Sequence, residues 1–341
     1  ADYVNLPYSQ IVTKAILPAL LYFTGIFISV HLEAKKLGLR GLDRSELPKI
    51  KPMLKKLYLL LPLVLLIYLV GTSQRSIQYA AALSIVACIF VTMFSRETRI
   101  TPMRLLEALA AGGQGTITVA AACGVAGIIA GTITMTGLAN LMINGIAALA
   151  GNSTFIALFL TMLCCIVLGM GVPTTATYCI MAATCAPILV RMGVPIVAAH
   201  FFVFYFGIVA DLTPPVALAA YAGAAIAQGN PMKTALVSTK LAIGAFIVPY
   251  AFALSPAMLL IDTTVPEVIL ITLTALAGIC GVSAGLEGYF LCPMKSWQRI
   301  LSALGGLLLI YPGILTDSIG FALVAAVLVM QLLEKKKKAA V

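Results

Sequence analysis

Charged side chains are scarce in this sequence. Only 10% of its 341 residues are Asp, Glu, Lys or Arg, whereas 61% are hydrophobic, and the mean hydropathy is +1.07. A soluble globular domain has about 25% charged and about 45–50% apolar residues. A chain of this composition could not hide its apolar surface from water. The sequence therefore excludes a soluble globular domain and indicates that most of the chain lies in lipid.

Patterns for metal ligation and disulfides are also lacking. The chain has two histidines, and its eight cysteines include no C-x-x-C pair. Most of these cysteines lie inside apolar runs, where a thiol behaves as a small buried hydrophobe. A disulfide framework or a metal site is therefore poorly supported. The sequence begins Ala-Asp-Tyr-Val without a signal-peptide pattern, and we expect a chain that is mature or truncated at its N-terminus.

The net charge of +10 comes from basic residues that lie between the apolar runs. They do not form a face interleaved with aromatic residues, so the sequence does not indicate nucleic-acid binding. Their placement is typical of cytoplasmic loops. The densest groups are Lys35, Lys36, Arg40, Arg44, Lys49, Lys51, Lys55 and Lys56, and then Lys335 to Lys338.

The apolar runs are too long for barrel strands, and only helices or closed barrels satisfy every backbone group in lipid. We predict an all-α polytopic membrane protein with about nine transmembrane helices, one re-entrant hairpin and one helix broken by two prolines. A surface helix is expected at 102–112 and an interfacial segment at 139–150. The simple spans are expected at 12–32, 55–71, 76–95, 115–138, 234–254, 267–287, 297–311 and 319–333.

The apolar segment 152–190 decides the topology. If it enters and returns on one side, nearly all basic groups and the tetralysine tail face the cytoplasm, and only Lys14, Arg75 and Arg191 lie outside. A single crossing would put the tail outside, against the positive-inside rule. Two separate crossings would also keep the parity, but 175–190 is short and opens with a turn. We therefore predict a re-entrant hairpin that opens from the outside, and a cytoplasmic C-terminus.

The predicted hairpin tip spans residues 169–177. Gly169 and Gly171 can adopt φ > 0 or allow close approach to the backbone, and Pro173 can start the return helix. The N-terminus of that helix would favour an anion, whereas the carbonyls that end the incoming helix could bind a cation such as Na⁺. Packing of helices through the glycines is the alternative interpretation. Hydroxyl groups at the tip come from Thr174, Thr175 and Thr177.

A second break is predicted near the middle of the long apolar run 195–227. Pro214 and Pro215 remove two amide donors, so the helix must unwind. The freed carbonyls and the Thr213 hydroxyl are oxygen donors that suit Na⁺. Asp211 is, by the sequence, the one acidic side chain set deep within an apolar run, and such a residue is a functional hypothesis because its burial is costly. A kink without a ligand and a purely structural hydrogen bond of Asp211 are the alternatives.

His200 lies eleven residues before Asp211, about three helical turns. The two residues could therefore share one helix face with Phe204 and Gly207 between them. One interpretation is a proton path through His200. The other is a histidine that is hydrogen-bonded between two helices.

These residues resemble a known family. Three runs carry the resemblance: Leu168 to Ala176 (LGMGVPTTA), Ala199 to Gly207 (AHFFVFYFG) and Asp211 to Tyr221 (DLTPPVALAAY). They are similar to the second hairpin and the Pro-Pro helix of the membrane subunit of TAXI-type TRAP transporters. The matching residues extend over roughly 1–262, and the resemblance is loose from 263 onward.

The resemblance implies a secondary transporter of the bacterial inner membrane without a cofactor. A gradient of Na⁺, or of H⁺, would drive uptake of a small carboxylate that a periplasmic solute-binding protein delivers, by an elevator-type movement. It also implies three parts. Residues 1–112 would be scaffold-type helices with the basic loop, 113–262 half of a transport domain, and 263–341 C-terminal helices with the basic tail.

Family members contain two inverted repeats, each with a hairpin and a Pro-Pro break, and this sequence shows only the second. We therefore expect the C-terminal half of a longer polypeptide, or one chain of a split one. The N-terminal half would supply the other ion site and much of the solute pocket. A passive channel or a scaffold subunit is the alternative, and an intramembrane enzyme would need a catalytic set that Asp211 and His200 alone do not provide.

Overall fold

The structure, a computed structural model, describes residues 1–339 apart from 44, 48–52, 55, 73–75 and 95–97. Over these described residues the named elements are all helices, and no strand is formed. The predicted all-α class is therefore confirmed. Several basic residues and prolines of the predicted loops lie outside the described residues, namely Arg44, Pro48, Lys49, Lys51, Pro52, Lys55, Arg75 and Arg96.

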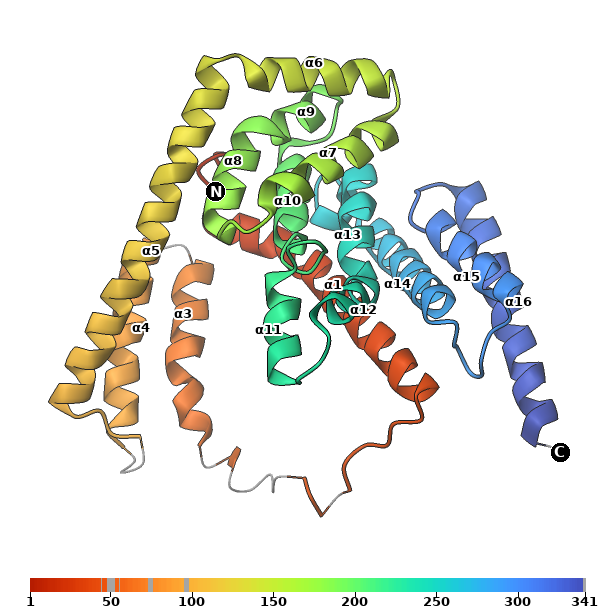
Figure 1. Cartoon of the computed structure of the whole chain (residues 1–341), viewed down its shortest axis with the longest axis horizontal. Coiled ribbons are helices and arrows are strands. Elements are labelled where there is room, and N and C mark those ends of the chain that lie inside the picture. The colour runs from red at the N-terminus through yellow and green to blue at the C-terminus, as the bar shows by residue number, and fades with distance from the viewer. Residues whose placement is uncertain (44, 48–52, 55, 73–75, 95–97, 340–341) are drawn as a thin grey trace. The chain divides into compact units, whose positions relative to one another are not determined.

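The helices follow the predicted runs closely (Figure 1). In the first part of the chain they are α1 (Tyr8–Lys36), η1 (Leu57–Leu60), α3 (Leu61–Thr72), α4 (Ile77–Thr92), α5 (Pro102–Met135) and α6 (Leu138–Ala150). The middle part contains α7 (Thr154–Gly169), α8 (Thr174–Thr184), α9 (Ala186–Arg191), α10 (Ile196–Val209), α11 (Leu218–Ile226), α12 (Pro231–Leu241), α13 (Ile243–Leu254) and η2 (Pro256–Leu259). The last three are α14 (Val265–Glu287), α15 (Ser296–Leu308) and α16 (Ile314–Ala339).

Four helical segments are long and apolar enough to cross a membrane: Tyr8–Lys36, Pro231–Leu254, Val265–Glu287 and Ile314–Lys337. Several shorter apolar helices lie between them, including α7 and α10. The chain is thus a multi-pass membrane protein, while the count of nine crossings stays a prediction. The predicted surface helix and the next predicted span form one continuous helix, α5, because no proline separates them and the glycine pair Gly112-Gly113 does not interrupt it.

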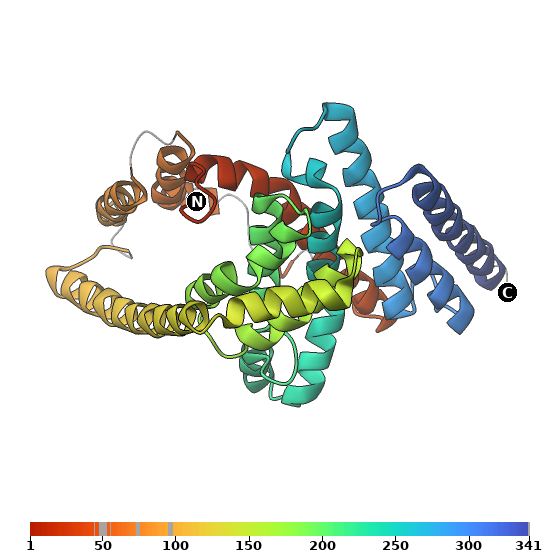
Figure 2. The ribbon, with the colours of Figure 1, turned by 90° about the horizontal axis from the view of Figure 1, so that it is seen from above.

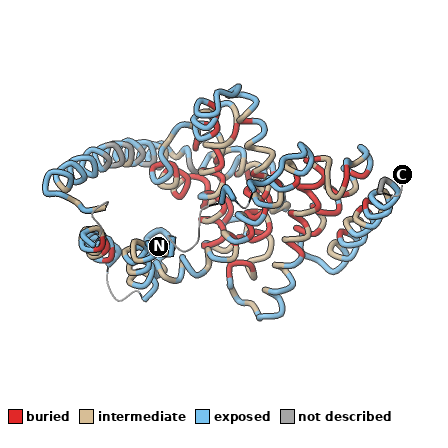
Figure 3. The backbone as a smooth tube through the Cα atoms, turned by 90° about the horizontal axis from the view of Figure 1, so that it is seen from below, coloured by how far each residue is buried: buried red, intermediate tan, exposed pale blue. Residues whose placement is uncertain are grey.

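The chain divides into two compact units. The first unit contains residues 1–13 and 40–120, and in it α3 packs against α4. The second unit contains residues 14–39 and 121–341, and most of the buried residues in Figure 3 belong to it. The predicted boundaries at 112 and 262 are not tested by this division and stay predictions.

Helix α10 forms the centre of the second unit. Its sequence is apolar all round, and most of its residues are buried, although Ile196 and Phe204 are exposed. It packs against α7, α8, α9 and α13. Phe202 and Phe206 of α10 are completely buried, and both rings lie edge-on to Tyr250 of α13. The predicted hairpin and the predicted broken helix thus share one core.

The last three helices, α14, α15 and α16, lie side by side (Figure 2). Glycines allow their backbones to approach closely, as is common between membrane helices. A Cβ atom on Gly306 of α15 would lie 2.5 Å from the carbonyl oxygen of Gly278 of α14. A Cβ atom on Gly320 of α16 would lie 2.8 Å from the carbonyl oxygen of Gly305. Tight packing through small residues therefore fixes this three-helix group.

Candidate functional site

The chain turns at the predicted hairpin tip. Helix α7 ends at Gly169 and α8 begins at Thr174, with Pro173 at the cap in an extended conformation. Gly171 has φ +72°, a left-handed conformation that glycine adopts at no steric cost. The helix break is therefore present where the sequence predicts it. Whether the hairpin is re-entrant in the membrane stays a prediction.

The two glycines of the hairpin tip have different structural roles. A Cβ atom on Gly169 would lie 2.9 Å from the carbonyl oxygen of Gly207 and 3.0 Å from the Cβ of Ala210. A Cβ atom on Gly207 would in turn lie 2.9 Å from the Cγ2 of Thr177. Gly169 thus allows the hairpin to pack closely on α10, which is the alternative interpretation for this residue. A Cβ atom on Gly171 would make only an ordinary contact, 3.9 Å from the Cγ1 of Val216, so this glycine is required for the turn and not for close packing.

The threonines of the tip also separate into two groups. Thr177 is buried, and its hydroxyl donates a hydrogen bond to the carbonyl oxygen of Val172 at 3.1 Å, which closes the turn. Thr174 and Thr175 are exposed at the start of α8. The first amides of a helix have no partner inside it and carry the positive end of its dipole. The exposed side of the tip therefore presents both amides and hydroxyls that could hold an anion.

The second break lies between Val209, where α10 ends, and Leu218, where α11 begins. Hydrogen bonds hold the intervening loop in shape. The Tyr221 hydroxyl donates to the carbonyl oxygen of Pro215 at 2.6 Å, and the Thr239 hydroxyl of α12 donates to that of Leu212 at 3.1 Å. Each carbonyl oxygen has two lone pairs, so these oxygens can still face an ion. Pro214 and Pro215 lie in this loop, joined by a cis peptide bond.

The side chains of Asp211 and Thr213 differ in their hydrogen bonding. The buried Thr213 hydroxyl donates back to the carbonyl oxygens of Val209 at 3.1 Å and Ala210 at 3.3 Å, and its oxygen keeps acceptor capacity. Asp211 is half-buried, and its Oδ1 atom is fully buried without a hydrogen-bond partner among the described residues. A buried carboxylate oxygen without a donor is costly. It is therefore available to a cation or a proton.

The hairpin tip and the second break lie next to each other. A Cβ atom on Gly171 would lie 3.9 Å from the Cγ1 of Val216, and Gly169 packs on Ala210 at the end of α10. The two stretches meet although more than thirty residues separate them in the chain. The structure thus brings the predicted tip residues and the predicted break residues into one neighbourhood.

His200 faces the return helix of the hairpin. Its Nδ1 atom lies 3.0 Å from the hydroxyl of Tyr178 of α8, and the Tyr178 ring also packs edge-on against Phe204. Gly207, two turns further along α10, packs on the same helix. His200, Phe204 and Gly207 therefore share the face of α10 that packs on α8, whereas Asp211 lies beyond the end of α10 at Val209, and a face shared with Asp211 stays a prediction. A hydrogen bond between helices is present, and the proton path stays a prediction.

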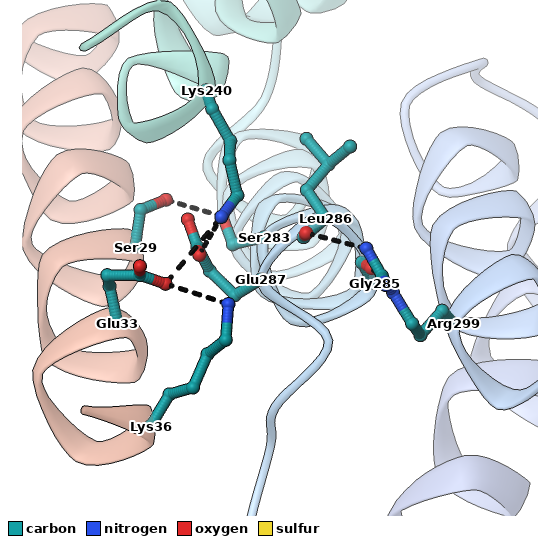
Figure 4. Close-up of polar contacts among 9 residues, drawn as sticks. All are labelled: Ser29, Glu33, Lys36, Lys240, Ser283, Gly285, Leu286, Glu287 and Arg299. Atoms are coloured by element: carbon teal, nitrogen blue, oxygen red, sulfur yellow. Dashed lines mark hydrogen bonds and ion pairs between the residues drawn. The ribbon is translucent and has the colours of Figure 1, made fainter. Parts of the chain in front are cut away.

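A cluster of charges that the sequence analysis missed lies where α1, α12 and α14 meet (Figure 4). The ammonium of Lys240 forms an ion pair with Glu287 and lies 3.6 Å from the Oε2 atom of Glu33. Glu287 is only 1% exposed and is more deeply buried than Asp211, so the sequence-based view of Asp211 as the one deep acid was wrong. Its place at the end of a predicted span concealed its burial.

One sequence signal could have indicated this cluster. Helix α1 carries Ser29 four residues before Glu33, and α14 carries Ser283 four residues before Glu287. Residues four apart share a helix face, so each pair forms a short polar stripe on an apolar helix. The two serines are buried and hydrogen-bonded to each other, with 2.9 Å between the Oγ atoms.

Comparison with known proteins gave one family. The family model described as "Tripartite ATP-independent periplasmic transporter, DctM component" matches residues 1–268. Neither the comparison with curated proteins nor that with solved structures gave a match. The matched region includes the hairpin, the second break and α12. It ends in the first turn of α14, so most of the last three helices lies beyond it.

Proposed function

Because the chain belongs to the family of the DctM component of tripartite ATP-independent periplasmic transporters, we propose that it moves a small carboxylate-type solute across a bacterial inner membrane at the expense of an ion gradient. This family is the membrane component of secondary transporters, which supports transport as the function rather than catalysis. The observation that supports the proposal is the contact between two helix breaks, one of which holds the unpaired Oδ1 atom of Asp211. Discontinuous segments of this kind indicate transporter binding sites.

The coupling ion would bind on the Asp211 side of these breaks. The carbonyls at Gly169 and Gly171 and the hydroxyl oxygen of Thr213 are uncharged oxygen ligands, and the Asp211 carboxylate would supply the negative charge. Such a mixture suits Na⁺, while the unpaired Oδ1 atom would also accept a proton. We favour Na⁺ because three of these four ligands, the two carbonyls and the Thr213 hydroxyl, are uncharged oxygens that do not take up a proton at physiological pH.

The solute carboxylate would bind on the other side of the tip. The start of α8 presents free amides, the positive end of a helix dipole and the exposed hydroxyls of Thr174 and Thr175. An anion at this place would lie beside a bound cation at the second break. Each ion would then favour binding of the other by electrostatic attraction, which is the physical basis of symport.

The family implies two kinds of partner, a periplasmic binding protein that delivers the solute and a small membrane subunit. In finer detail, we propose that the chain is of the TAXI type and contributes the second of two inverted repeats. A complementary N-terminal half would complete the solute pocket. Transport would proceed by an elevator-type movement of the part that carries the hairpin, with the C-terminus in the cytoplasm.

Reconstituted vesicles test this proposal. The chain, the complementary N-terminal half, the small membrane subunit and the binding protein are placed in proteoliposomes, and uptake of labelled carboxylates is measured under an imposed Na⁺ or H⁺ gradient. We expect uptake to need one of the two gradients and to collapse with the matching ionophore. Asp211→Asn removes the buried charge and should lower uptake by about tenfold or more, since an ion loses a charged ligand worth at least about 1.4 kcal/mol.

The matched control is Asp262→Asn, which removes an exposed carboxylate in the loop before α14 and should leave uptake unchanged. Uptake that ignores both gradients would contradict the proposal. Ionic conductance in the absence of the binding protein would instead favour a passive channel.

A further inference from the structure

We propose that α14, α15 and α16 form a module docked on the family part of the chain, and that Glu287 of this module positions the second break through Lys240. Nothing in the family match explains these helices, because the match ends at residue 268. The docking part of the proposal is independent of what the protein transports. Its consequence for uptake rests on the proposed function.

The docked face of α14 contacts α1 along two successive turns. Near the middle of the helix, a Cβ atom on Gly25 of α1 would lie 3.0 Å from the Cγ2 of Ile279. One turn further, the buried hydroxyls of Ser29 and Ser283 are hydrogen-bonded at 2.9 Å. This hydrogen bond in an otherwise apolar interface favours one register, because a shift of either helix would break it.

Charges fix the end of the same interface (Figure 4). Lys240 of α12 lies between two carboxylates, Glu33 from the family part and Glu287 from the module. Glu287 is 1% exposed, and its Oε1 atom has no hydrogen-bond partner among the described residues. The buried charge of Glu287 therefore depends on the Lys240 ammonium, and separating the two would leave an uncompensated charge in the interface.

Lys240 connects this interface to the second break. It follows Thr239 in the last turn of α12, and the Thr239 hydroxyl shares its proton between the carbonyl oxygens of Ala235 in its own helix at 2.9 Å and Leu212 at 3.1 Å. Leu212 is the residue after Asp211. One turn of α12 is thus held on one side by the break and on the other by Glu287. A displacement of Lys240 would therefore shift the carbonyl of Leu212, the residue that follows the proposed ion-binding Asp211.

Glu287 is therefore a positioning residue rather than an ion ligand. The loss of Asp211 would remove a proposed ion ligand. The loss of Glu287 should instead weaken ion binding although all the proposed ion ligands are still present. A purely structural role would lower the amount of folded protein without a change in the apparent affinity of the molecules that remain.

A first experiment measures docking without transport. All eight native cysteines are replaced, and Ser29→Cys and Ser283→Cys are introduced together into the full chain. We expect a disulfide to form readily under mild oxidation, since the two Oγ atoms are only 2.9 Å apart. A matched pair, Ser29→Cys with Ser302→Cys of α15, should not cross-link. Absence of the Ser29–Ser283 disulfide would overturn the docked arrangement.

A second experiment measures positioning without transport. In the cysteine-free chain, Ala220→Cys of α11 is buried and should react slowly with a thiol reagent. Adding Glu287→Gln should speed its labelling by about two- to thirtyfold, the range expected for loss of one coupling contact. Glu267→Gln, an exposed acid at the other end of α14, is the control and should leave the rate unchanged. Equal labelling rates in both variants would overturn the positioning role.

The transport readout completes the test. In proteoliposomes, Glu287→Gln should raise the KM for the coupling ion by about two- to thirtyfold with a nearly unchanged maximal rate. The double variant Lys240→Glu with Glu287→Lys keeps one ammonium between two carboxylates and should restore most of the affinity. If the wild-type chain shows no uptake, the proposed function fails while the cross-linking and labelling results still decide the inference. If uptake is normal in Glu287→Gln, the positioning role fails and the proposed function stands.

Discussion

At the scale of single residues, the same residue type serves unrelated purposes a few positions apart. Gly169 and Gly171 differ in the room available for a side chain and in backbone conformation. A side chain at Gly169 would collide with the backbone of α10, whereas Gly171 has φ +72° with its nearest neighbour 3.9 Å away. Only the environment in the folded chain separates the two, because the sequence places both glycines in one short motif.

This difference makes a testable prediction. Asn adopts the left-handed conformation more easily than other side chains, so Gly171→Asn should be tolerated. Gly169→Asn should lower the free energy of unfolding by at least about 1–3 kcal/mol, because its Cβ alone would lie 2.9 Å from the carbonyl oxygen of Gly207. Thermal unfolding of the two purified variants in the same detergent measures the difference. Equal losses would contradict the assignment of Gly169 to packing.

At the scale of elements, the last three helices depend on glycine contacts more than on large apolar side chains. A Cβ atom on Gly306 would lie 2.5 Å from the carbonyl oxygen of Gly278 and 2.7 Å from the amide nitrogen of Val282. Both neighbours are backbone atoms, which cannot rotate away as a side chain can. Any substitution at Gly306 must therefore separate α14 from α15.

We expect Gly306→Val to lower the free energy of unfolding by about 1–3 kcal/mol or more, the usual cost of overpacking. Gly131→Val in α5 is the matched control, because no atom of the described residues outside the adjoining backbone of α5 lies within 4 Å of the position of its Cβ. Thermal unfolding followed by circular dichroism measures both variants. A Gly306→Val protein as stable as the Gly131→Val protein would show that α14 and α15 do not pack as closely as described.

Local signals explain which elements the sequence predicts well. The breaks after Gly169 and after Val209 were predicted because prolines and glycines act on the backbone within a few residues. The pairing of Glu33 with Lys240 and Glu287 was missed, since these residues lie on three helices and Glu33 is more than 200 residues from either partner. Likewise, no local sequence pattern predicts that Gly169 packs on α10, because that contact depends on how α7 and α10 pack against each other.

At the scale of the whole molecule, the charged cluster bears on membrane topology. Glu33 and Glu287 share one lysine, so the ends of α1 and α14 lie on the same side of the membrane. Between these ends, apart from the hairpin segment, the sequence predicts six crossings, at 55–71, 76–95, 115–138, 195–227, 234–254 and 267–287. Six is even, so the segment 152–190 must cross an even number of times. The ion pair thus argues against a single crossing of 152–190 without use of the positive-inside rule, and it is compatible with either a re-entrant hairpin or two separate crossings.

Labelling from one side of the membrane tests this parity. In the cysteine-free chain, Lys36→Cys reports the end of α1, Lys337→Cys the end of α16 and Asp262→Cys the loop before α14. In right-side-out vesicles, an impermeant maleimide should label Asp262→Cys directly and the two lysine replacements only after permeabilisation. The basic residues that flank the inner ends then lie where the positive-inside rule places them. If Lys36→Cys and Lys337→Cys are labelled from opposite sides, residues 152–190 cross the membrane as one span. The prediction of a re-entrant hairpin that opens from the outside would then be wrong.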